Sequence, residues 1–249
     1  MEDNTLIKKE KKIYFRPLIY FAAAFLMEIV MEVLMTLILP ESYLYKNLLV
    51  WFFGKAAPLI FLLIILRKDI KEKSMAVGHN FGRFVIYLII SFGALYLLES
   101  GVSYYSLLMD KYFQIGEASN QEAIYEYFKV SSSFFNYAFL FIVIVIFAPI
   151  LEELEFRHLI SEGFKGMHWT VGLAVGSVLF GLIHMTSLID LKEWAYFPIY
   201  ALPGLGLGII YHYGGKNFYT DIMCHAGINL ISFIQIIRLL NETVNEVTL

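Results

Sequence analysis

Glu152 and Glu153 are adjacent carboxylates in a stretch whose neighbours are almost all apolar, and Arg157 follows shortly after them. Two histidines, His184 and His225, lie in later apolar stretches. A charged side chain inside a membrane segment is energetically costly, so it usually faces a protein cavity and usually has a function. Two carboxylates and two imidazoles can together activate a water molecule. These residue types therefore indicate hydrolytic chemistry within a membrane.

The carboxylates follow a proline in the fourth apolar stretch. Glu153 and Arg157 are four residues apart, so they can pair on one helical face. Glu152 lies about 100° round from Glu153 by α-helical geometry and can face a different group. Pro149 lacks a backbone N–H and predicts a kink just before the carboxylates. One alternative stays open here, in which the bilayer ends near Leu151 and these charges form a solvated helix end.

Each histidine shares a helical face with one other residue. Phe180 precedes His184 by four residues, and Asn229 follows His225 by four. His184 and Glu152 are equally far in sequence from the turn between their stretches, so an antiparallel hairpin places them at the same depth. Unpartnered imidazole and amide groups are costly in lipid and should turn inward. The alternative is that they only hydrogen-bond neighbouring helices and hold a bundle together.

The elements that must position these residues are long apolar stretches. Apolar residues make up 59% of the 249-residue chain, and the mean hydropathy is +0.65. Soluble domains rarely exceed about half apolar residues, and about 20 apolar residues cross a bilayer. The sequence therefore predicts an all-α, polytopic transmembrane helical bundle of about seven spans, or eight if another segment re-enters the membrane. The predicted spans are 17–39, 48–66, 82–108, 134–162, 169–189, 195–212 and 219–240.

The distribution of charge predicts the orientation of this bundle. Lys and Arg are enriched in cytoplasmic loops, and a cytoplasmic N-terminus puts twelve of them inside and four outside. We therefore expect a multi-pass cell-membrane protein in contact with the lipid bilayer. No repeat, linker or low-complexity tract divides residues 1–249, which predicts a single transmembrane domain. Neither a basic, aromatic-interleaved patch nor a glycine-rich phosphate loop indicates nucleic acid as a partner.

The order of the three motifs resembles the CPBP family, also called the Abi or type II CAAX protease family, whose members are polytopic membrane peptidases. The motifs are Glu152-Glu153…Arg157, Phe180…His184 and His225…Asn229. The glycine-rich stretch 203–208 is also similar to the family's sixth-helix region. The similarity covers about 143–232, the predicted catalytic core. The chain departs from the family pattern at His158, where a small residue is usual, and at Glu155, which adds a third carboxylate.

The resemblance implies an intramembrane endopeptidase, a hydrolase that cleaves peptide bonds with an activated water molecule. Glu152 would be the general base, and His184 would hold and polarise the water. His225 and Asn229 would donate hydrogen bonds to the developing oxyanion. Three further residues would support these four from behind: Glu153, Arg157 and Phe180.

The substrate implied by the resemblance is a membrane-associated peptide or protein, such as a CAAX-like tail, a pheromone precursor or a bacteriocin-type peptide. The Lys-, Ile-, Tyr- and Asn-rich composition favours a bacterial plasma membrane. No cofactor is predicted, but Zn²⁺ stays open as an alternative, because Glu152, His184 and His225 could form a zinc sphere with an open position. Against zinc, these residues come from three separate stretches, and the sequence contains no His-Glu-x-x-His motif.

Two other functions stay open. The chain could be a non-catalytic membrane scaffold or regulator, since a family fold can persist without turnover. It could also be an ion-coupled carrier built on Glu28 and Glu32 of the first span together with the Glu152 cluster. However, these two acids could instead pair with Lys55 of the second span, and no inverted repeat supports a carrier.

Overall fold

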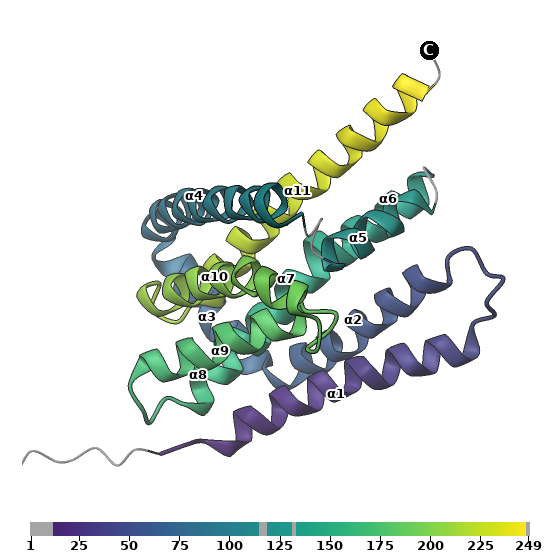
Figure 1. The fold of residues 1–249 in the computed structure, drawn as a ribbon. Coiled ribbons are helices and arrows are strands. Elements are labelled where there is room, and N and C mark those ends of the chain that lie inside the picture. The colour runs from purple at the N-terminus through teal and green to yellow at the C-terminus, as the bar shows by residue number, and fades with distance from the viewer. Residues whose placement is uncertain (1–11, 115–118, 131–132, 248–249) are drawn as a thin grey trace, which may run out of the picture.

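Helices are the only regular elements in the computed structural model, which describes residues 12–114, 119–130 and 133–247 (Figure 1). The first five are α1 (Phe15–Ile38), α2 (Lys46–Ile65), α3 (Arg67–His79), α4 (Phe81–Phe113) and α5 (Ser119–Lys129). One continuous helical run then comprises α6 (Phe134–Phe141), the π-helical η1 (Ile142–Phe147), α7 (Ala148–Glu152), the π-helical η2 (Glu153–Leu159) and α8 (Ile160–Gly163). The last three are α9 (Trp169–Ile183), α10 (Leu191–Tyr213) and α11 (Phe218–Val247).

Six of the described helices are long and apolar enough to cross a bilayer: α1, α2, α4, the run Phe134–Gly163, α10 and the Phe218–Leu240 part of α11. The apolar α9 is shorter, at 15 residues. With α9 included, the predicted all-helical fold with about seven spans is confirmed. The fifth span ends earlier than predicted, because the hydroxyl of Ser187 accepts the N–H groups of Ile189 and Asp190 and turns the chain.

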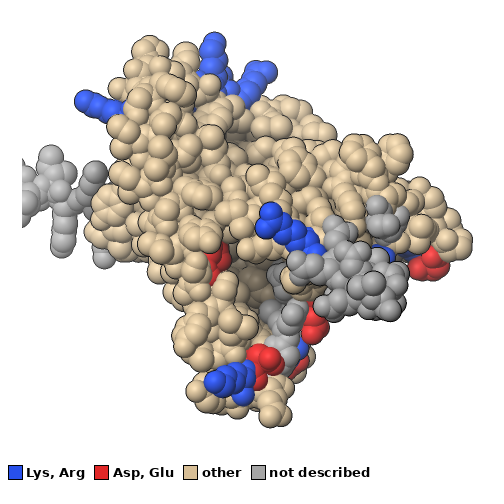
Figure 2. All heavy atoms as spheres, turned by 90° about the horizontal axis from the view of Figure 1, so that it is seen from above, with Lys and Arg blue, Asp and Glu red and all other residues tan. Residues whose placement is uncertain are grey.

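The surface matches a protein that faces lipid. Large apolar side chains are exposed along the long helices, among them Leu37, Ile89 and Leu97. The face seen from above is largely uncharged, with Lys, Arg, Asp and Glu at its margins and around a hollow beside the atoms drawn in grey (Figure 2). Exposed apolar side chains on long helices are expected where lipid replaces water as the solvent.

Two helices, α3 and α5, are not predicted by the apolar pattern because both are polar. The basic α3 contacts α2, α4 and α11. Its Ile70 packs against the core cluster that contains Leu62 and Phe218. Helix α5 buries Phe128 against Leu140 and Phe233. Both helices therefore cover ends of the bundle rather than cross it.

The run Phe134–Gly163 forms the centre of the bundle. Its segments contact α1 and α2 on one side and α9, α10 and α11 on the other (Figure 1). Every residue from 151 to 160 is buried, including five charged or titratable ones: Glu152, Glu153, Glu155, Arg157 and His158. A helix buried on all sides in this way carries its polar groups into the protein and not into lipid.

The π-helical segment η1 accommodates Pro149. The N–H of Ala148 donates to the carbonyl of Val143, five residues earlier. In this register the carbonyl of Ile144 would need an N–H from residue 149, which proline lacks. The side chain of Asn229 on α11 supplies it, with Nδ2 donating to the Ile144 carbonyl at 2.9 Å. Pro149 thus changes the helical register and ties α11 to the central run.

Candidate active site

Glu153 is the fixed point of the site. Its Oε2 lies 3.0 Å from Nε of Arg157, so the predicted ion pair is confirmed. Its Oε1 lies 2.8 Å from Nδ1 of His225. A carboxylate only accepts hydrogen bonds, so Nδ1 of His225 carries the proton. The other ring nitrogen, Nε2, is then directed toward Glu152, 3.9 Å from its Oε2.

Glu152 is buried between two helices that bring nitrogen groups to its two oxygens. Nζ of Lys55 on α2 lies 3.9 Å from Oε1, and Nε2 of His225 on α11 lies 3.9 Å from Oε2. Both distances are too long for direct hydrogen bonds. Glu152 therefore keeps its acceptor positions for a water molecule or a substrate while cationic or polar groups stay close.

His184 terminates α9 and is held there by its own helix. Its Nδ1 lies 2.7 Å from the carbonyl of Phe180, one of the last carbonyls of the helix. Because a carbonyl can only accept, Nδ1 donates, and Nε2 of the neutral ring keeps its lone pair. The ring stacks on Tyr200 of α10, with centroids 5.2 Å apart and planes 19° apart. His184 and Glu152 are close enough to interact electrostatically.

Phe180 links the arginine to both histidines. The guanidinium carbon of Arg157 lies 4.3 Å from the Phe180 ring centroid, in a cation–π contact. The same ring lies 4.6 Å from His184 and 6.0 Å from His225, centroid to centroid. The contact is close because α10 has a glycine here: a Cβ on Gly204 would lie 3.1 Å from the ring. The predicted supporting residues thus form one packed layer behind the site.

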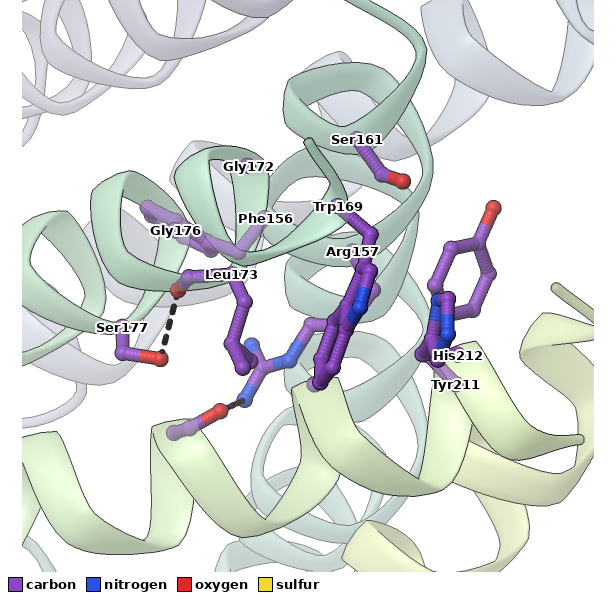
Figure 3. A pocket seen from close by; sticks show the side chains of 12 residues that line it. Phe156, Arg157, Ser161, Trp169, Gly172, Leu173, Gly176, Ser177, Tyr211 and His212 are labelled. Atoms are coloured by element: carbon purple, nitrogen blue, oxygen red, sulfur yellow. Dashed lines mark hydrogen bonds between the residues drawn. The ribbon is translucent and has the colours of Figure 1, made fainter. Parts of the chain in front are cut away.

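A small cavity of about 20 Å³ lies on the far side of Arg157. Figure 3 shows the guanidinium extending to α10, where Nη2 donates to the carbonyl of Gly204 at 3.4 Å. The ring of Trp169 closes the cavity by stacking on His212, with centroids 3.9 Å apart. A space of this size is large enough for about one water molecule. The arginine is therefore held from behind as well as by Glu153.

Lys55 is a site residue that the sequence does not distinguish from a boundary charge. Its Nζ lies 2.7 Å from Oε1 of Glu28 on α1, so the expected pairing of Lys55 with the first span is confirmed for this acid. The one signal in the sequence is that Lys55 is the only charged residue within 48–66. The pairing also occupies a carboxylate that an ion-coupled carrier would need.

A cavity of about 660 Å³ brings these groups together. All four predicted catalytic residues line it: Glu152, His184, His225 and Asn229. They come from α7, the end of α9 and α11, so the three motifs converge on one space. Glu99 of α4 lines the same cavity, and nothing in the sequence pattern singles it out.

The two departures from the family pattern have different positions. His158 is directed toward α3 and away from the cavity: Nε2 lies 3.1 Å from Oδ2 of Asp69, and Nδ1 lies 3.2 Å from the hydroxyl of Tyr211. Glu155 lines the cavity itself. His158 therefore fixes the position of α3, whereas Glu155 adds a carboxylate to the site.

The donors suggested for zinc do not form a metal site in this arrangement. Within the described ranges, no three His, Cys, Asp or Glu side chains lie close enough together to hold a metal ion. His225 is already bound to Glu153 through Nδ1. The ammonium group of Lys55 also lies beside Glu152, where a cation would have to bind. No step of the chemistry below is therefore assigned to a metal.

Comparison with known proteins identifies a family for this part of the chain. A protein of Mycoplasma capricolum subsp. capricolum, described only as uncharacterized, is 26% identical over 171 residues, which cover 68% of this chain and 49% of its own length. The chain thus spans about half the length of this curated relative. No solved structure matches. Residues 134–231 match the family model for Type II CAAX prenyl endopeptidase Rce1-like proteins, and this segment contains all three motifs. The match places the segment 134–231 in the Rce1-like type II CAAX prenyl endopeptidases of the CPBP family, the family that the motifs resemble.

Proposed function

We propose that this protein is an intramembrane endopeptidase that cleaves a membrane-associated peptide or protein with a water molecule activated by Glu152 and His184. The observation that carries the proposal is the single cavity lined by Glu152, His184, His225 and Asn229. The family match of the segment that contains them supports peptidase chemistry. A scaffold without catalytic activity would not need to bring all four groups to one space.

The first step is attack by water on the scissile carbonyl. A water molecule between Glu152 and His184 would donate one hydrogen bond to the carboxylate and the other to Nε2 of the histidine. Glu152 takes the proton as the water oxygen bonds to the carbonyl carbon. It then delivers this proton to the leaving nitrogen as the C–N bond breaks, which yields a carboxylic acid and an amine. No covalent enzyme intermediate is required.

Two groups on α11 would stabilise the oxyanion of the tetrahedral intermediate. The Asn229 amide carries two hydrogens on Nδ2, and its bond to the Ile144 carbonyl uses one of them. His225, protonated on both ring nitrogens, would donate from Nε2 while Glu153 holds Nδ1. One oxyanion donor typically contributes about 10²–10³ in kcat. The short links to Glu153 and Ile144 fix both donors before the substrate binds.

The substrate class proposed here is a peptide or protein whose cleavage site reaches the membrane, with CAAX-like tails, pheromone precursors and bacteriocin-type peptides as candidates. The long apolar helices support a multi-pass membrane protein. We further propose a bacterial plasma membrane and a cytoplasmic N-terminus, because that orientation places most of the Lys and Arg inside.

The test compares purified wild type with Glu152→Gln and His184→Gln on a panel of candidate peptides, with and without chelator. Removal of a general acid–base group is expected to lower kcat/KM by about 10²–10⁴. Glu126→Gln is the matched control, because it makes the same chemical change at an exposed carboxylate on α5. Unchanged cleavage in both site variants would exclude the proposed roles. Loss of wild-type cleavage with chelator alone would show that a metal is required.

A further inference from the structure

The cavity contains more negative than positive groups. Five carboxylates line it: Glu28, Glu32, Glu99, Glu152 and Glu155. Among the described lining residues, Lys55 is the only lysine or arginine. Its ammonium group lies 2.7 Å from Glu28 and 3.9 Å from Glu152. Lys55 is therefore shared by two of the five acids, and three acids remain without an ion pair to a lysine or arginine in the described structure.

Glu155 is the most telling of these three acids. It is 2% exposed, and its Oε1 has no hydrogen-bond partner within the described residues. Buried polar atoms in proteins are almost always hydrogen-bonded, so an unsatisfied one calls for a ligand or another explanation. The side chain lines the cavity three residues after Glu152, and the proposed chemistry does not use it. Its unmet acceptor points to a positively charged or hydrogen-bond-donating ligand.

The two other acids approach the cavity from different helices. Glu32 comes from α1, and Glu99 comes from α4, on the side of the cavity where it interacts electrostatically with His225. Carboxylates from α1, α4 and η2 therefore surround the space in which the substrate would lie. Charges act strongly across a protein cavity because it is less polarisable than water.

We infer that the cavity binds a cationic substrate segment, with a Lys or Arg side chain close to the scissile bond. The inference rests on the proposed function and narrows its substrate class. A long basic side chain can bring its charge to the acids while its methylene groups lie along the apolar lining. A bare metal ion fits less well, because no three acidic, histidine or cysteine side chains of the described chain converge on one point.

The test uses matched peptides of equal length that differ at one position, where lysine is exchanged for neutral norleucine, scanned through three residues on each side of the scissile bond. Wild type is expected to cleave the lysine peptide with a kcat/KM about tenfold or more higher at one or more positions. Glu155→Gln and Glu99→Gln are expected to reduce that ratio. Glu126→Gln, at an exposed carboxylate outside the cavity, is the matched control and is expected to retain it.

A charge exchange makes the test sharper. Glu99→Lys is expected to reverse the preference, so that a glutamate peptide is cleaved faster than its lysine counterpart. Equal kcat/KM for lysine and norleucine peptides at every position would refute the inference and leave the endopeptidase proposal intact. If no peptide is cleaved, the endopeptidase proposal fails, and the inference is then decided by the affinities of the same fluorescent peptides for wild type. Equal affinities would refute it, and tighter lysine binding would support it.

Discussion

The hydrogen bond from Asn229 to Ile144 gives a quantitative prediction, because the helix cannot satisfy this carbonyl by itself. Asn229→Ala removes the donor that replaces the missing N–H of Pro149. Hydrogen bonds between membrane helices contribute about 0.6 kcal/mol on average, whereas an unsatisfied buried polar group costs about 1–3 kcal/mol. Ile144 lines the cavity, so water can reach its carbonyl in part. We therefore expect a loss near the overlap, about 1 kcal/mol, which corresponds to about 2–4 °C in Tm.

A double-mutant cycle isolates this interaction. Pro149→Ala restores an N–H at the position that the π register requires, so Asn229→Ala should cost clearly less in that background. The assay is thermal unfolding of the purified protein in detergent, followed by circular dichroism. Asn136→Ala is the control, because Asn136 donates to the Tyr127 carbonyl at 3.3 Å, away from the proline. An equal cost of Asn229→Ala with and without Pro149 would refute the reasoning.

Two other variants test the surroundings of the site. Lys55→Met should lower kcat/KM by about tenfold or more, since it leaves Glu152 in a buried group of acids, and Lys55→Arg should recover part of the loss; peptide cleavage measures both, and equal rates for Met and Arg would contradict a role for the charge. Gly204→Ala should lower Tm because its Cβ would press on Phe180 at 3.1 Å, at a cost of about 1–3 kcal/mol. Gly93→Ala, whose Cβ meets nothing within 4 Å, is the matched control and should leave Tm unchanged or slightly higher.

Much of the fold could be predicted because lipid leaves the chain few choices. Every long apolar stretch must be helical to satisfy its backbone groups, so composition and length alone give the spans. The polar α3 and α5 carry no such signal. The short α9 was predicted as a longer span, because the apolar pattern does not show that Ser187 turns the chain after His184.

The site could be predicted only as far as its motifs extend. The i, i+4 spacing correctly predicts the Glu153–Arg157 pair, and the motif order predicts that the histidines meet the carboxylates in one cavity. Lys55 and Glu99 lie on helices without a motif. A single charge in an apolar span is compatible with either the lipid boundary or the interior, and only the packing of α2 and α4 decides between them. The catalytic roles themselves remain predictions.

The two π turns in the central run make its length critical. A π turn holds one more residue than the α-helix it interrupts, and one residue corresponds to about 100° of rotation. Deleting a single residue from η1 would return that turn to ordinary geometry and swing Glu152 and all that follows out of alignment. Loops of such a protein can lengthen or shorten as homologues diverge, but this helix has to keep its residue count. Insertions and deletions in natural relatives should therefore stop at its two ends.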